Sequence, residues 1–132
     1  MPKATKKKVV FAAMSKDIFY WREHIIKYIL EEGHTPLCAF MMFSYFLLDT
    51  VDRVALIESN NDLVRLANEL WVFGKLTTGV KAEIDVARAS DIPVRYFTIA
   101  EIKGTVEDKF EGDITLDERI QEVSADTFPN HA

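Results

Sequence analysis

The sequence predicts an α/β protein with a three-layer, Rossmann-like (flavodoxin-like) architecture, in which helices cover both faces of a parallel sheet. Short apolar runs typical of buried strands alternate along the chain with segments whose apolar residues recur at helical spacing. This alternation favours parallel strands joined by right-handed helical crossovers. The length of 132 residues fits one such unit.

The first strand is predicted at Lys8–Ala13, a short apolar run that follows a charged tail. A helix is expected from Ile18 to Gly33, because apolar residues there recur at helical spacing, at Ile18, Trp21, Ile25 and Ile29. Gly33 is typical of a helix end. A second strand is predicted at Thr35–Phe40, followed by a loop through Met41–Tyr45.

The segment Asp49–Ala67 is compatible with a helix, and a break is expected at its polar middle, Glu58–Asp62. Glu69–Gly74 is the clearest strand, since it is short, apolar and closed by glycine. We then expect a turn at Lys75–Gly79. The elements predicted after that turn are a helix at Val80–Ser90, a strand at Ile92–Phe97 and a short helix at Leu116–Val123.

Three regions are expected: a flexible basic tail at residues 1–8, the α/β domain at 9–98, and a charged extension of that domain at 99–132. The net charge of -5 gives no general attraction to phosphate, so no nucleic acid polymer is predicted as a partner. No apolar run has the length of a membrane span, so no membrane partner is expected either. The single Cys38 forms no internal disulfide, and we predict a cytoplasmic protein.

Ligands of open parallel sheets bind beyond the carboxyl ends of the strands, at a switch in strand order. Four segments qualify here: Met14–Asp17, Phe40–Tyr45, Gly74–Gly79 and Thr98–Glu101. The third is the most informative, because two glycines bracket a short loop and a helix begins directly after it. The predicted substrate-binding residues are Met14, Ser15, Phe43, Tyr45, Gly74, Thr77, Thr78 and Gly79.

Glu83 is the strongest candidate for chemistry. It lies beside the apolar stripe of the helix Val80–Ser90, and positions three and four residues away offer no cation. Asp85 differs, because Lys81 and Arg88 lie at those spacings. A structural role for Glu83, as a carboxylate paired across the fold, stays open.

Asp17 and Asp49 are weaker candidates for a catalytic acid. Asp17 also suits a helix cap, and Asp49 also suits an ion pair with Arg53, four residues on. The three histidines show no metal-ligand spacing and Cys38 does not complete one, so we predict no metal and no cofactor.

The chain resembles the nucleoside 2-deoxyribosyltransferase superfamily, above all its small uncharacterised branch. The resemblance spans roughly Val9 to Phe97. It is carried by the residues and motifs that match the family pattern in order along the chain. They are the opening apolar strand Val9–Met14, the helix end Glu32–His34, the apolar strand in Ala67–Gly74 before a variable loop, the Gly-Val-x-x-Glu motif in Thr78–Ile84, the small residue Ala87 and the Pro-Val in Ile92–Val94. Leu76–Thr78 stands where the enzymes of the family have an aspartate.

The resemblance implies that Glu83 is a catalytic nucleophile, which attacks the anomeric carbon of a deoxyribose and forms a covalent glycosyl intermediate. The implied activity is N-glycosidic cleavage or deoxyribosyl transfer on a nucleoside or nucleoside monophosphate. A homodimer or higher homo-oligomer is also implied. Two alternatives stay open: a nucleotide- or ribose-phosphate-binding module without catalysis, and a structural or partner-binding protein.

Overall fold

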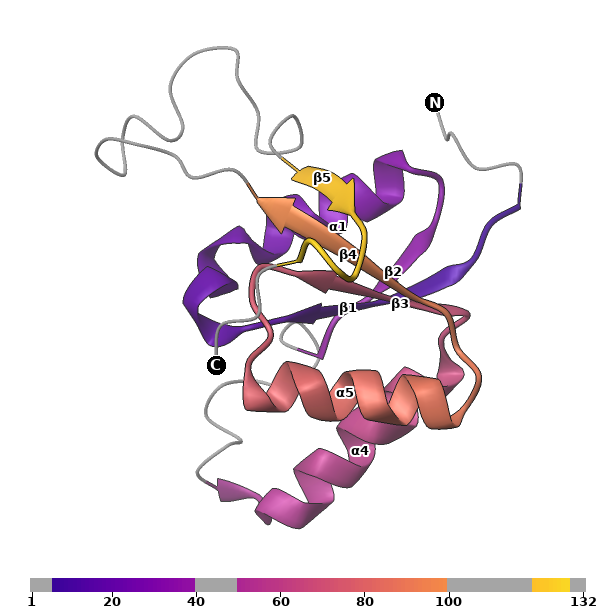
Figure 1. The fold of residues 1–132 in the computed structure, drawn as a ribbon. Coiled ribbons are helices and arrows are strands. Elements are labelled where there is room, and N and C mark those ends of the chain that lie inside the picture. Colours follow the sequence, from indigo (N-terminus) through magenta and orange to yellow (C-terminus); the bar gives the residue numbers. More distant parts are fainter. Residues whose placement is uncertain (1–5, 40–49, 100–119, 129–132) are drawn as a thin grey trace.

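The computed structural model describes residues 6–39, 50–99 and 120–128, and shows one five-stranded sheet with the order β2-β1-β3-β4-β5 (Figure 1). The strands are β1 (Val9–Met14), β2 (Thr35–Leu37), β3 (Glu69–Phe73), β4 (Val94–Ile99) and β5 (Ile120–Val123). The first four are parallel, and β5 runs antiparallel to β4. The predicted α/β class with a parallel sheet is therefore confirmed, with one antiparallel strand added at the edge.

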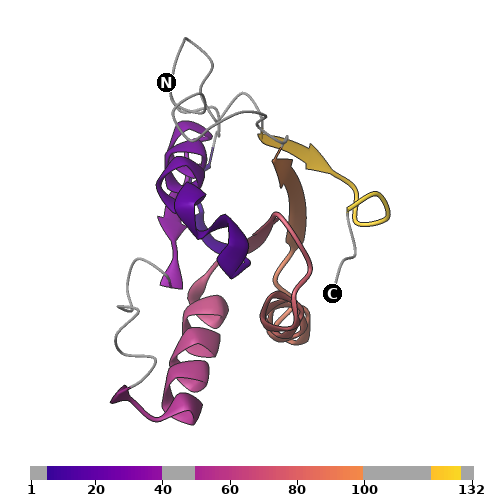
Figure 2. The ribbon, with the colours of Figure 1, turned by 90° about the vertical axis from the view of Figure 1, so that its left-hand side faces the viewer.

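Helices cover both faces of the sheet, as the sequence predicts. A 3-10 helix, η1 (Lys16–Trp21), continues into α1 (Arg22–Glu31) on one face. The other face is covered by α4 (Arg53–Leu66) and α5 (Thr78–Ala89). Figure 2 shows α1 and η1 on one side of the strands and α5 on the other.

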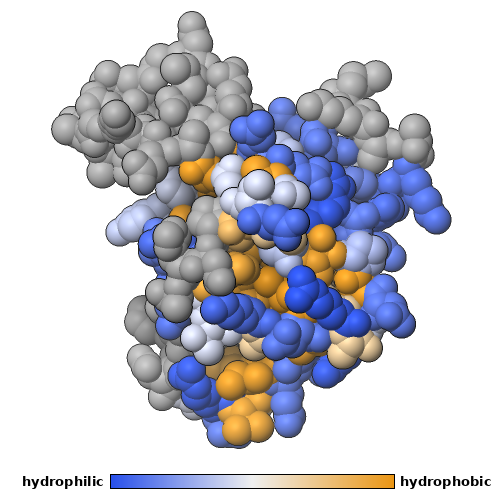
Figure 3. All heavy atoms as spheres, viewed as in Figure 1, coloured by the Kyte–Doolittle hydropathy of each residue, from blue (hydrophilic) through white to orange (hydrophobic). Residues whose placement is uncertain are grey.

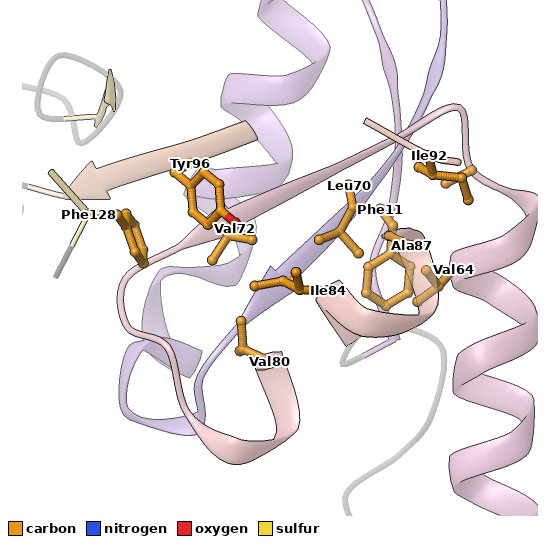
Figure 4. Packing of buried hydrophobic residues seen from close by; sticks show 12 residues of the cluster. Phe11, Val64, Leu70, Val72, Val80, Ile84, Ala87, Ile92, Tyr96 and Phe128 are labelled. Carbon is orange, nitrogen blue, oxygen red and sulfur yellow. The ribbon is translucent and has the colours of Figure 1, made fainter. Parts of the chain in front are cut away.

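Two apolar layers hold these helices to the sheet. Figure 4 shows the layer beneath α4 and α5, where Val80, Ile84 and Ala87 of α5 face Leu70 and Val72 of β3. The layer beneath α1 contains Ile25 and Ile29 with the aromatic residues of the central strands, Trp71, Phe73 and Phe97. Successive strand residues point to opposite faces, so β1 and β3 supply both layers and are buried along almost their whole length.

A network of charged side chains joins β3, β4 and β5 and includes Lys8, which directly precedes β1. Glu69 is 6% exposed and accepts hydrogen bonds from Lys8 at 2.6 Å, from Trp71 Nε1 at 2.8 Å and from Arg95 at 3.3 Å. Arg95 also pairs with Glu122 of β5 at 2.7 Å. The buried carboxylate is therefore compensated, and the antiparallel edge strand is tied to β4.

Two predictions of secondary structure are wrong: one helix and one helix break. The stretch Leu116–Val123 is not a helix where it is described, because Ile120–Val123 forms β5. Its apolar residues have helical spacing, but pairing with β4 places Ile120 and Val123 in opposite layers. The expected break at Glu58–Asp62 is also absent, because α4 is one continuous helix across it.

Other differences concern boundaries. The predicted first helix begins with the 3-10 turns of η1, and the α-helix starts at Arg22. The strand predicted at Thr35–Phe40 ends at Leu37, while Phe40 lies outside the described residues. The last parallel strand begins at Val94, two residues later than predicted, and Pro93 contributes its carbonyl group to the amide of Leu70 at 2.9 Å.

Candidate functional site

The switch in strand order lies between β1 and β3. From β1 the chain first adds β2 on one side and then returns to add β3 on the other side. The two strands end together, because Met14 pairs with Phe73 in the parallel register. Loops after these ends diverge to opposite faces of the sheet, which is where open α/β sheets bind ligands.

An ion pair joins the two loops at this point. Nζ of Lys75, after β3, lies 3.0 Å from Oδ2 of Asp17, after β1. The Ser15 hydroxyl donates a short hydrogen bond to Oδ1 of Asp17. The Ser15 hydrogen bond, and then Lys75, hold the pKa of Asp17 below its usual value. Asp17 is therefore ionised at neutral pH, which does not favour its predicted role as an acid.

Gly74 allows the two loops to approach each other. Its φ of +90° is a conformation that residues with a side chain rarely adopt. A Cβ at this position would lie 2.8 Å from Cδ1 of Ile18. Gly74 thus has a structural reason to be glycine, whether or not its main chain also contacts a ligand.

The turn leads into the N-terminus of α5. Thr77 caps the helix, since its hydroxyl oxygen accepts from the amide of Val80 at 3.3 Å. Thr78 and Gly79 follow and are exposed. A Cβ at Gly79 would meet nothing within 4 Å, so packing does not require glycine there.

Glu83 lies in the second turn of α5 and is half-buried. Its Oε2 accepts a hydrogen bond from Nδ2 of Asn60, in the middle of α4, at 2.7 Å. Burial raises the pKa of Glu83 to about 7, and the Asn60 hydrogen bond opposes that rise. The expected alternative of a carboxylate paired across the fold is met in part, but its partner is a neutral amide.

A carboxylate in this state suits nucleophilic or acid–base chemistry. Near neutral pH it exchanges its proton readily, and a half-desolvated anion is more reactive than a hydrated one. Two other carboxylates among the described residues differ from it. Glu69 and Asp17 have cationic partners and lowered pKa values, so they are stable anions. This contrast singles out Glu83.

The remaining predicted site residues are either buried near the end of β1 or lie outside the described residues. Met14 is 5% exposed and packs in the layer beneath α1, so its side chain is a core side chain. Ser15 is buried beside Asp17. Phe43, Tyr45 and Asp49 lie outside the described residues. Among the residues that the structure describes, no group of three or more His, Cys, Asp or Glu side chains could hold a metal ion.

Two residues of the site were not among the predicted ones. In the sequence, Asn60 lies in the polar stretch Glu58–Asp62, which favours a helix break, and Lys75 lies in the predicted turn Lys75–Gly79. Neither has a local sequence signal for its contact, because Asn60 reaches Glu83 across 23 positions and Lys75 meets Asp17 through the adjacency of β1 and β3.

A shallow hollow elsewhere on the surface contains none of these residues. It lies where α5 ends and β4 begins, and is lined by Arg88, Asp91, Ile92, Pro93, Val94, Tyr96 and Ala125. Its hydrogen bond from Arg88 to the Tyr96 hydroxyl, at 2.9 Å, links α5 to the sheet. Ligand sites of parallel sheets form at the other ends of the strands, so this hollow is not the candidate site.

The sheet order and the helices on both faces define an α/β protein, and its similarity to two solved structures shows a nucleoside 2-deoxyribosyltransferase-like fold. A 2-deoxyribosyltransferase from the psychrotolerant bacterium Bacillus psychrosaccharolyticus has a similar structure, with a TM-score of 0.56 and 11% identity over 76% of this chain and 80% of that chain. A 2-deoxyribosyltransferase from Leishmania mexicana gives a TM-score of 0.54 and 12% identity, over 94% and 83% of the two chains.

The chain belongs to the family described as Domain of unknown function (DUF7768), whose model matches residues 11–97. That match begins within β1 and ends within β4, so it includes all but the first two residues of the segment Val9–Phe97 on which the sequence resemblance rests. A search among curated proteins finds no match. Within the described residues, no helix is long and apolar enough to cross a membrane.

Proposed function

We propose that this protein cleaves or transfers the N-glycosidic bond of a nucleoside or nucleoside monophosphate, with Glu83 as the nucleophile. The observation that carries the proposal is the state of Glu83: a half-buried carboxylate with a pKa of about 7, held by a neutral donor. The fold supports the same substrate class, because the two similar structures are 2-deoxyribosyltransferases.

The proposed reaction has two steps. A carboxylate oxygen of Glu83 attacks the anomeric carbon, the bond from that carbon to the base breaks, and the base leaves with the bonding electrons and takes up a proton. Water then attacks the same carbon, releases Glu83 and gives up a proton. A second base in place of water would complete a transfer instead of a hydrolysis.

We assign substrate binding to the loops at the switch in strand order. The ionised carboxylate of Asp17 suits a sugar hydroxyl as an acceptor, and Thr77, Thr78 and the open surface at Gly79 line the start of α5. Met14 contributes through its main chain in this assignment, because its side chain is in the core. Phe43, Tyr45 and Asp49 stay predictions from the sequence.

A binding module without catalysis is the second candidate. Two observations favour it. Leu76–Thr78 stands where the enzymes of the nucleoside 2-deoxyribosyltransferase superfamily have an aspartate, and Asp17 is an ion-paired anion that does not replace a proton donor. In that case Glu83 would accept a hydrogen bond from a sugar hydroxyl and no bond would break.

Base release separates the two functions. The protein is incubated with a panel of deoxynucleosides and their 5′-monophosphates, and free base is measured by chromatography. Cleavage that is lost in Glu83→Ala and retained in Asp85→Asn, an exposed carboxylate of the same helix, supports the enzyme. A raised melting temperature without base release would reject the enzyme and support the module. If no base is released and the melting temperature does not change, a structural or partner-binding protein is favoured.

We also propose a homodimer or higher homo-oligomer. On α4, Val54 and Ile57 are 58% and 50% exposed and lie one helical turn apart. Figure 3 shows apolar atoms at the lower end of the molecule, where Figure 1 places α4. Sedimentation velocity tests this surface: Ile57→Asp should lower the measured mass, whereas a wild-type monomer would contradict the proposal.

A further inference from the structure

The contact between α4 and α5 includes a hydrogen bond between two polar side chains in addition to apolar packing. Asn60 and Glu83 are half-buried polar residues on two helices that pack on the sheet through apolar side chains and through the Arg88–Tyr96 hydrogen bond. Their hydrogen bond of 2.7 Å joins Nδ2 of the amide to Oε2 of the carboxylate. Among the described residues, no other hydrogen bond or ion pair is shown for either side chain.

We propose that Asn60 is the positioning residue of Glu83: its amide fixes Oε2 and leaves Oε1 as the oxygen that bonds to the sugar. This inference rests on the proposed function and names a second residue of that site. Asn60 itself does not touch the reacting atoms in this scheme.

The neutrality of the amide is the chemical reason for the assignment. A cation at this distance would hold Glu83 as a weakly nucleophilic ion pair, as Lys75 holds Asp17 and as Lys8 and Arg95 hold Glu69. An amide gives the anion one hydrogen bond, fixes its direction and leaves the negative charge uncompensated. Such fixed donors raise reactivity by holding the attacking group in line.

Helix formation does not explain Asn60. Asparagine is a poor helix former in a helix interior, because its side chain competes for backbone hydrogen bonds. Here the side chain is directed away from its own helix to α5. The next residue, Asn61, is also half-buried in α4, but no contact with Glu83 is shown for it, which makes it a matched control.

Charged side chains near Asn60 and Glu83 do not explain the raised pKa of Glu83. The charged residues of α4 (Arg53, Glu58, Asp62 and Arg65) and of α5 (Lys81, Asp85 and Arg88) are exposed. By strand alternation, the described strand residues that face the two helices carry no charge, and among them the Tyr96 hydroxyl accepts a hydrogen bond from Arg88. Burial and the Asn60 hydrogen bond are the causes that act on the pKa of Glu83.

The test compares wild type with Asn60→Ala, Asn60→Asp and the control Asn61→Asp. The first measurement is the titration of the Glu83 side-chain carboxyl carbon by NMR, with its signal assigned through Glu83→Gln. We expect Asn60→Ala to raise the pKa of Glu83, because the anion loses its donor. Asn60→Asp should raise it further and couple the two titrations, because two carboxylates then share one site. Asn61→Asp should leave it unchanged.

The second measurement is base release as a function of pH. Loss of positioning should lower kcat of Asn60→Ala by roughly 10- to 100-fold with KM changed far less, and Asn60→Asp should move the rising limb of the pH profile upward. Asn61→Asp should keep the wild-type profile. Asn60→Asp keeps the size of the side chain, so it still decides the question if Asn60→Ala does not fold.

The two proposals fail in different ways. If Glu83 titrates identically in wild type, Asn60→Ala and Asn60→Asp, the positioning role is overturned, whatever the enzyme does. If wild type releases no base from any substrate of the panel, the proposed function is overturned, while the titration still decides whether Asn60 acts on Glu83.

Discussion

Asn60 of α4 donates a hydrogen bond of 2.7 Å to Glu83 of α5, and this contact between two half-buried residues is the centre of the candidate site. The two helices cover the same face of the sheet, and the contact lies beside their shared apolar layer. It combines a pKa near neutrality, which lets Glu83 exchange a proton, with a fixed carboxylate orientation, which suits an attacking group.

Glu83→Gln should stabilise the fold at alkaline pH. The pKa of Glu83 is about 7 in the folded protein, above the ordinary value of 4.5, so ionisation opposes folding. The stability associated with the protonated form is fully present below about pH 4.5 and is lost as pH rises through 7. Urea unfolding at pH 8 should show Glu83→Gln to be more stable than wild type, by at most about 3 kcal/mol. Near pH 4 the difference should vanish. An equal stability of the two proteins at pH 8, with Asp85→Asn as reference, would contradict the raised pKa.

The Asp17–Lys75 pair should contribute little to stability, because both side chains are about half exposed. Asp17→Asn should cost less than about 1 kcal/mol at pH 7. The lowered pKa of Asp17 means that this contribution is present above the unfolded value of 3.8 and is lost as pH falls below it. A much larger effect on substrate KM than on the unfolding free energy would support its place in the site. Equal binding by wild type and Asp17→Asn would remove it from the site.

Two glycines that bracket the turn should respond oppositely to alanine. Gly74→Ala should destabilise the protein by about 1–3 kcal/mol, since it combines a φ of +90° with a Cβ that lies 2.8 Å from Ile18. Gly79→Ala should be neutral or stabilising by up to about 1 kcal/mol, because the space there is open and alanine favours the helix. Thermal unfolding of the two variants measures both effects. A destabilised Gly79→Ala would indicate a constraint that the structure does not contain.

Glu69 should make the stability of the fold sensitive to acid. Its cationic partners Lys8 and Arg95 and the indole of Trp71 keep its pKa low although burial alone would raise it. Glu69→Gln should cost about 1–3 kcal/mol at pH 7. The loss should fade as pH falls through the folded pKa, below the ordinary value of 4.5, because wild type then loses the same charge. Glu23→Gln, an exposed residue of α1, serves as the reference in urea unfolding. A loss that is independent of pH would contradict the network.

The elements that could be predicted are those whose pattern is local. The apolar stripe Val80, Ile84 and Ala87 predicts α5, and the apolar run of β3 predicts a buried strand. The strand β5 could not be predicted in this way. Its pairing with β4 decides its conformation, and Ile120 and Val123 have a spacing that a helix would also show.

The error at α4 has a related cause. Helix propensity alone favours a break at Glu58–Asp62, but Val64 and Leu63 pack against the core on the C-terminal side of that stretch. Asn60, which weakens the local helix prediction, binds Glu83 on the neighbouring helix. The sequence could indicate Glu83, because no cation lies three or four residues away from it in its own helix. Its partner Asn60 could not be predicted, because that contact depends on the packing of α4 against α5.

Covalent capture of Glu83 tests the central claim most directly. The protein is quenched in acid during turnover of the best substrate in the panel, digested, and examined by mass spectrometry. We predict a deoxyribosyl adduct on the peptide that contains Glu83, its absence from Glu83→Gln, and an unchanged adduct in Asp85→Asn. An adduct on a different residue, or base release by Glu83→Gln at the wild-type rate, would contradict the assignment of Glu83 as the nucleophile.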